Sequence, residues 1–263
     1  MAAGAVLVIT LLNLRGVRES ATACAGPVYA FIAIVLGLVA VGLWKASQGT
    51  LGLAEVPPSV AQAAAPAAIS FFLVLRAFAS GCATLTGVEA VADGAEAFRQ
   101  PSGGNAAKVL AILAATLGTM TVGIAILARL VQAHAHPDET VVSQIGRQVF
   151  GANAAYFVLQ LLTAIILVLA ANTSFAGFPR LAAFMAGDGN MPRQLANLGD
   201  RLVYSNGIIA LAVGACVLII GFGGEVTRLI PLYAVGVFTA FTLSQAGMVR
   251  HWKSHPEPGW QLR

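Results

Sequence analysis

Charged residues are scarce in this sequence, where Asp, Glu, Lys and Arg together make up 10% of the 263 residues. Ordinary soluble domains carry about 25% charged residues. Hydrophobic residues make up 58% of the chain, and the mean hydropathy is +0.81. This shortage of charge excludes a soluble globular domain and predicts a chain that lies in a lipid bilayer. In such a chain the net charge of +4 informs on loop orientation, and we expect no nucleic-acid partner.

Cysteine is equally scarce. The three cysteines, Cys24, Cys82 and Cys216, fall in three different apolar runs, which excludes a disulfide framework and a cysteine metal centre. The sequence also lacks a nucleophile paired with a base, a glycine loop that would cradle phosphate, and a metal motif of recognisable spacing. We therefore expect neither enzymatic activity nor a cofactor.

Long apolar runs are what the sequence does contain, and about 20 such residues cross a bilayer. Complete spans are predicted at 26–44, 67–98, 109–128, 152–179, 207–224 and 229–249, after a first run, 2–14, that we interpret as a span cut short. The run 152–179 is long enough to cross with tilt or to bend. The whole chain, 1–263, is thus predicted to be one all-α, polytopic transmembrane domain.

A further helix is predicted between the runs 109–128 and 152–179. Pro137-Asp138 is typical of a helix start, and four apolar residues then fall on one helical face: Val141, Val142, Ile145 and Val149. We expect a surface helix that caps the bundle.

Basic residues are divided unequally between the two sides that alternating spans define. One side receives ten of the 15 Lys and Arg: Arg15, Arg18, Arg99, Lys108, Arg180, Arg193, Arg201, Arg250, Lys253 and Arg263. Because cytoplasmic loops carry the excess of Lys and Arg, this side is predicted to be cytoplasmic, and with it the C-terminal end of the chain.

The segment 67–98 carries the main candidate site. As one helix its 32 residues would extend about 48 Å, against a hydrocarbon core of about 30 Å, and it contains Gly81, Gly87 and Gly94. We expect a break at Gly87, because broken helix at membrane depth is tolerated where it lines a cavity. There the Thr86 hydroxyl, the Glu89 carboxylate and free carbonyls offer oxygen ligands to a cation. A carboxylate within a span is a functional-site hypothesis by default, with a structural ion pair as the alternative.

Two weaker sets of candidates accompany this site. Asp93 and Glu96 share the helical face of Glu89 and would form a cytoplasmic path for cations, although acids at a helix end that enters water are commonplace. Asn172, Thr173 and Ser174 form a polar group in an apolar run. They would supply ligands, but hydrogen bonding between helices explains them equally well.

Longer stretches resemble the amino acid, polyamine and organocation (APC) permease superfamily, and within it the KimA-type potassium importers. They include LNLRGVRES, ATLTGVEA, LVLAANTSFAGFPRLAAFMAGDGNMPR, GDRLVYSNGIIAL, ETVVSQIG and LIPLYAVGVF. The resemblance implies an inverted-repeat fold of the LeuT type that works as a homodimer. This chain would represent about helices 4 to 10 of 12, without the first three and the last two helices.

The resemblance also implies a secondary transporter that imports potassium with protons. Potassium would be held by Thr86 and Glu89 of the broken sixth helix, and Glu89 is also a candidate proton carrier. The alternatives are an amino acid permease of the same superfamily and a non-transporting membrane scaffold. Residues 80–85, SGCATL, lack the bulky aromatics with which those permeases usually close over a substrate, which favours a small ion.

Overall fold

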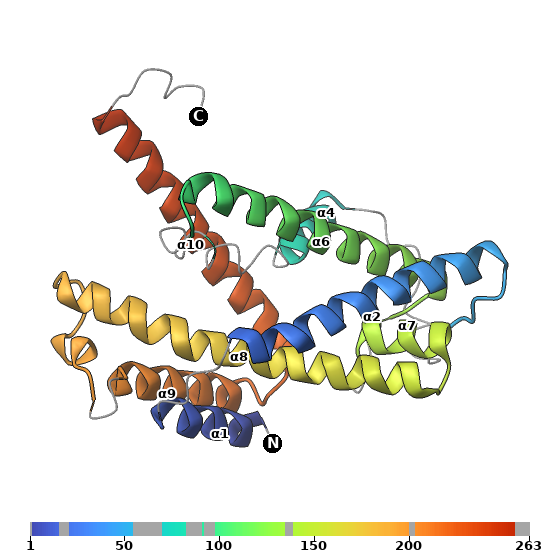
Figure 1. Ribbon diagram of the computed structural model, residues 1–263, viewed down its shortest axis with the longest axis horizontal. Coiled ribbons are helices and arrows are strands. Elements are labelled where there is room, and N and C mark those ends of the chain that lie inside the picture. The colour runs from blue at the N-terminus through green and yellow to red at the C-terminus, as the bar shows by residue number, and fades with distance from the viewer. Residues whose placement is uncertain are drawn as a thin grey trace. The chain divides into compact units, whose positions relative to one another are not determined.

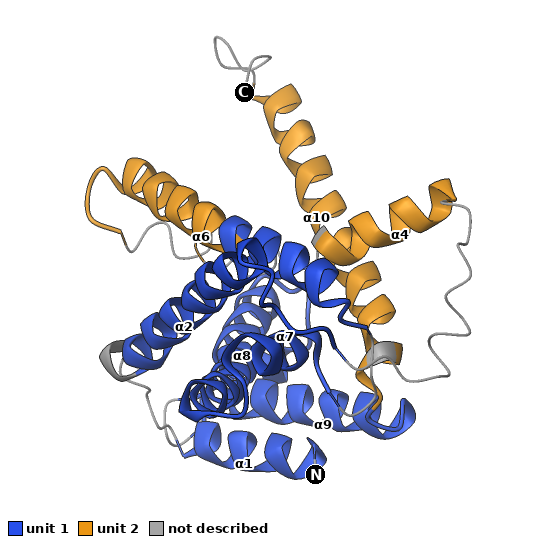
Figure 2. Cartoon of the chain, turned by 90° about the vertical axis from the view of Figure 1, so that its right-hand side faces the viewer, with its two compact units in different colours: residues 1–65, 118–224 blue, residues 66–117, 225–263 orange. Residues whose placement is uncertain are grey.

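The computed structural model of the chain describes residues 2–15, 21–54, 70–82, 91, 98–134, 139–199 and 203–255. Every regular element within these ranges is a helix (Figure 1). The chain divides into two compact units, 1–65 with 118–224 and 66–117 with 225–263 (Figure 2).

The first unit contains most of the helices. These are α1 (Ala2–Leu14), α2 (Ala21–Ser47), the second part of α6 (Ser102–Val131), α7 (Val141–Phe150), α8 (Ala154–Gly187), the 3₁₀ turn η3 (Arg193–Ala196) and α9 (Ser205–Gly221). α8 contacts α2, α7 and α9, and α1 contacts α9. α8 is therefore the element to which much of this unit attaches.

Two apolar clusters hold this unit together. The larger joins α2, α6, α7 and α8 through Val35, Leu38, Val39, Met120, Leu127, Ile145, Val149 and Leu159. The smaller joins α1, α8 and α9 through Ile9, Phe175, Ile208 and Ala212. Between helices that cross a bilayer, close packing of side chains is the main source of association.

Glycine permits the close approach of α2 and α6. A Cβ built on Gly123 would lie 2.5 Å from a methyl of Val39, and one on Gly42 would lie 2.7 Å from a methyl of Leu127. Such distances are closer than carbon atoms tolerate, so a side chain at either position would force its neighbour to shift.

The second unit contains α4 (Phe71–Cys82), the first part of α6 and α10 (Val226–Ser254). α4 contacts α10. The apolar side chains of α4 are largely exposed, with Phe71 at 76% and Phe72 at 80%. In water such a face would be unfavourable by about 25 cal/mol per Å², and this exposure is what a helix facing lipid is expected to have.

Four helices are long and apolar enough to cross a membrane, namely Cys24–Ser47, Ser102–Val131, Ala154–Gly187 and Arg228–Ser254. They match the predicted spans at 26–44, 109–128, 152–179 and 229–249. α9 is shorter, with 17 residues, at the lower limit of a span. Of the predicted span 67–98, the structure describes α4 and a few flanking residues.

The structure bears on two local expectations. α8 runs as one 34-residue helix through Asn172 and Pro179, so the predicted run is helical without interruption. Pro137 and Asp138, the predicted start of the surface helix, lie outside the described residues; among those described, α7 begins at Val141 with Thr140 as its N-cap. The Thr140 hydroxyl accepts a hydrogen bond from the Ser143 amide at 3.2 Å, which satisfies an otherwise unpaired donor of the first turn.

Candidate functional site

The predicted cation site lies outside the described residues. Thr86, Gly87, Glu89, Asp93 and Glu96 all fall in the stretches 83–90 and 92–97, beyond the described end of α4 at Cys82. Their roles therefore stay predictions.

Asn172 is joined to another helix. Its side-chain oxygen accepts a 2.6 Å hydrogen bond from the amide of Asn13 on α1, which also donates to the Ile9 carbonyl at 3.0 Å. α1 and α8 are thereby linked by polar contact beside the smaller apolar cluster. Hydrogen bonding between helices is the alternative to a ligand role for this residue, and the contact is of that kind.

The neighbouring hydroxyls are placed differently. The Thr173 hydroxyl donates to the carbonyl of Ala170 in its own helix at 2.7 Å, a bond that threonine commonly makes within helices. Ser174 is exposed on α8. The predicted ligand roles of Asn172, Thr173 and Ser174 therefore stay predictions.

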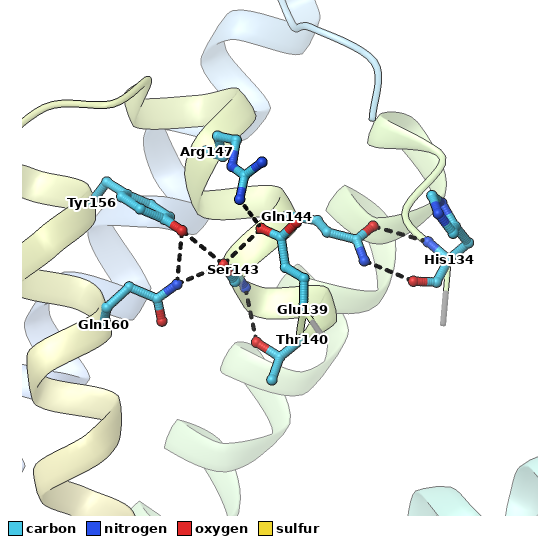
Figure 3. Close-up of polar contacts among 8 residues, drawn as sticks. All are labelled: His134, Glu139, Thr140, Ser143, Gln144, Arg147, Tyr156 and Gln160. Atoms are coloured by element: carbon cyan, nitrogen blue, oxygen red, sulfur yellow. Dashed lines mark hydrogen bonds and ion pairs between the residues drawn. The ribbon is translucent and has the colours of Figure 1, made fainter. Parts of the chain in front are cut away.

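A second polar cluster, which the sequence did not single out, joins α7 to α8 (Figure 3). Its centre is Ser143, a residue that is 5% exposed. The Ser143 hydroxyl donates to Glu139 at 2.8 Å and accepts from the amide of Gln160 at 2.6 Å. The Tyr156 hydroxyl lies 2.9 Å from Ser143 and accepts from Gln160 at 3.0 Å. Because serine has a single hydroxyl proton, which it donates to Glu139, the Tyr156 hydroxyl is the donor to Ser143.

The same cluster continues along α7. Glu139 forms a 2.8 Å ion pair with Arg147. The side chain of Gln144 pairs with the backbone of His134, accepting from its amide at 3.2 Å and donating to its carbonyl at 2.8 Å (Figure 3). Glu139, Ser143 and Arg147 follow at intervals of four residues, as do Tyr156 and Gln160. This spacing was the available signal, since residues four apart share a helical face.

The other end of α7 is held by Lys45, which follows Trp44 at the end of the second apolar run. Its ammonium group donates to the carbonyl of Val149 at 2.7 Å. A cation at a helix C-terminus satisfies a free carbonyl and interacts favourably with the helix dipole. α7 is thus fixed at both ends to the helices it covers.

Nothing in this cluster suggests a reaction. Its hydroxyls and the Glu139 carboxylate are engaged in hydrogen bonds or an ion pair, which is how a polar network contributes rigidity at a helix interface. Among the described residues no group of three or more His, Cys, Asp or Glu gathers to hold a metal ion. The cluster therefore explains how the predicted surface helix is anchored.

The similarity of the chain to known proteins places it in a family. A family model described as "Amino acid permease" matches residues 1–262. The potassium transporter KimA of Bacillus subtilis (strain 168) is 50% identical over 256 residues, which cover 97% of this chain and 42% of that protein. The chain thus spans less than half the length of this relative.

The match extends over the helices described above as well as the predicted cation site. Together with the apolar helices it identifies a multi-pass membrane protein, as the resemblance of the longer stretches predicts. The chain belongs to the amino acid permease family.

Proposed function

We propose that the chain is part of a secondary active transporter that imports potassium. The observation that carries this proposal is the 50% identity, over 97% of the chain, to a protein named as a potassium transporter. Because the match covers nearly the whole chain, the stretch around Glu89 lies inside the matched region.

The proposed site consists of Thr86, Gly87 and Glu89. A break at Gly87 would leave helix carbonyls at the negative end of a helix dipole, next to the Thr86 hydroxyl and the Glu89 carboxylate. Oxygen atoms of this kind replace the hydration shell of a potassium ion. The carboxylate costs on the order of 2.5 to 3.5 kcal/mol to insert, which the binding of a cation would offset.

Further features of the proposal follow from the resemblance. Import is coupled to protons, with Glu89 as a candidate carrier, and Asp93 and Glu96 form the cytoplasmic path. The chain adopts part of an inverted-repeat fold of the LeuT type, about helices 4 to 10 of 12, and the transporter works as a homodimer. These proposals are supported by the family match and by the all-helical architecture.

The decisive experiment replaces Glu89 by Gln in the intact transporter and measures rubidium or potassium uptake in cells that lack other potassium uptake. The change keeps size and hydrogen bonding but removes the charge, so uptake should fall to background while the amount of protein in the membrane stays normal. Glu225→Gln is the matched control, because Glu225 is an exposed carboxylate that pairs with Arg228, and it should leave uptake unchanged. Wild-type uptake by Glu89→Gln would refute the proposed site.

The second candidate function is amino acid transport, which the description of the matching family favours. In that case hydrogen bonds to Thr86 and Glu89 would hold an ammonium group in place of a bare ion. The wild-type protein would then take up labelled amino acids with no response to potassium, and this result would replace potassium by an amino acid as the substrate.

A further inference from the structure

We propose that His251 and His255, at the C-terminal end of α10, form a binding site for a divalent transition-metal ion such as Zn²⁺. The two imidazole rings stack with their centres 5.1 Å apart and their planes at 24°. Both residues are exposed. The site is separate from the residues that the proposed transport function uses.

The backbone gives the pair its spacing. The amide of His255 donates to the carbonyl of His251 at 2.9 Å, so the helical hydrogen bond continues to the capping residue of α10. Two histidines four residues apart on a helix lie on one face, the arrangement that supplies two zinc ligands in helical metal motifs. The two side chains are therefore already on a common face without any change of the backbone.

The distance between the rings fits chelation. Zinc binds imidazole nitrogen at about 2.0 to 2.1 Å with tetrahedral geometry, which puts the centres of two chelating rings roughly 5 Å apart. The observed 5.1 Å meets this requirement. The nearly parallel rings need to rotate about their Cβ–Cγ bonds to direct one nitrogen each at the ion, and their exposure leaves room for this rotation.

The surroundings favour a cation. The free carbonyls and the dipole of a helix C-terminus attract positive charge. Arg250 and Lys253 are positively charged and would repel a metal ion. Because each residue of an α-helix turns by about 100°, both lie roughly 100° or more around the helix from the face of the two histidines. Trp252 packs edge-on against His251, with ring centres 5.7 Å apart, and supports that ring from the side.

The ligand set determines the class of metal. Two imidazoles suit zinc, copper or nickel, whereas magnesium and calcium prefer carboxylate and carbonyl oxygen. Since no third His, Cys, Asp or Glu joins the pair among the described residues, water or an exchangeable donor completes the coordination. Such a site binds reversibly and holds the last turn of α10.

The test is titration of the purified transporter, prepared without a histidine tag, with Zn²⁺ in a calorimeter. Wild type should bind an ion that His251→Gln and His255→Gln each bind roughly tenfold or more weakly, because each loses one of two protein ligands. Mg²⁺ should give no comparable signal. Zinc should also slow amide hydrogen exchange in the last turn of α10 in wild type but not in the variants.

A matched control keeps the number of histidines and changes their register. In the double variant Lys253→His with His255→Gln, the two imidazoles are two residues apart and fall on opposite faces of the helix, so chelation should be lost. His134→Gln removes a histidine elsewhere and should bind zinc as wild type does. The proposal is overturned if the register variant binds as tightly as wild type, or if wild type binds no more tightly than the single variants of the pair.

Discussion

Single polar side chains attach α7 to its neighbours, and the Ser143 hydroxyl makes three of these contacts. It contacts Glu139, Tyr156 and Gln160 through one oxygen atom. The sequence places all four residues at helical spacing, but it does not show that two helices face one another at these positions. Which helices face one another is decided by tertiary packing, here that of Ile145 on α7 with Leu159 on α8. A periodic pattern within one helix does not show which other helix it will contact.

Ser143→Ala should therefore destabilise the protein measurably. The change leaves the half-buried amide of Gln160 without one acceptor and the Glu139 carboxylate without one donor, a loss of about 1 to 3 kcal/mol. Equilibrium unfolding in a denaturing detergent measures this. Ser174→Ala, on the exposed surface of α8, is the matched control and should change stability little. Equal stability of the two variants would show that the Ser143 network contributes nothing.

Whole helices are predicted more reliably than their attachments. The apolar runs at 26–44, 109–128, 152–179 and 229–249 anticipate four helices. The structure extends three of them at both ends and α8 at its C-terminal end only. The apolar face of α7 is also anticipated, since Ile145 and Val149 are buried and Val141 and Val142 pack against them. The N-cap of α7 at Thr140 is not anticipated, because a capping bond depends on the local path of the chain and proline does not by itself determine it.

The contact between α2 and α6 leads to a prediction about glycine. Gly123→Ala should destabilise the protein by about 1 to 3 kcal/mol, because the new methyl group would overlap Val39 and force the two helices apart. Gly118→Ala is the control on the same helix, where a Cβ meets nothing within 4 Å. It should be neutral or stabilising by up to about 1 kcal/mol through helix propensity. Detergent unfolding of both variants checks the difference, and an equal effect of the two would contradict the close approach.

At the scale of the whole molecule, the charged fraction of 10% predicts a membrane protein, and apolar runs of about 20 residues predict that helices span the bilayer. The longer stretches that resemble the APC superfamily add the family, and the matching family model confirms that membership. The cation site is inferred from Thr86, Gly87 and Glu89 alone. Its geometry depends on how a broken helix meets its neighbours, which periodicity and composition do not specify.

Orientation is the remaining property of the whole molecule that the sequence predicts, and cysteine labelling tests it. With ten of the 15 Lys and Arg on one side, single cysteines at Ser102 and Asn190 should react with an impermeant maleimide only from the cytoplasm. A cysteine at Ala152, in the exposed connection between α7 and α8, should react only from outside. Ser143 in the same region is too buried, at 5% exposed, to be labelled.

Each cysteine is introduced into a variant without Cys24, Cys82 and Cys216, and labelling after permeabilisation shows that every site is reactive. If Ala152 reacted from the same side as Asn190, α8 would not cross the membrane, and the assignment of the basic side to the cytoplasm would fail with it.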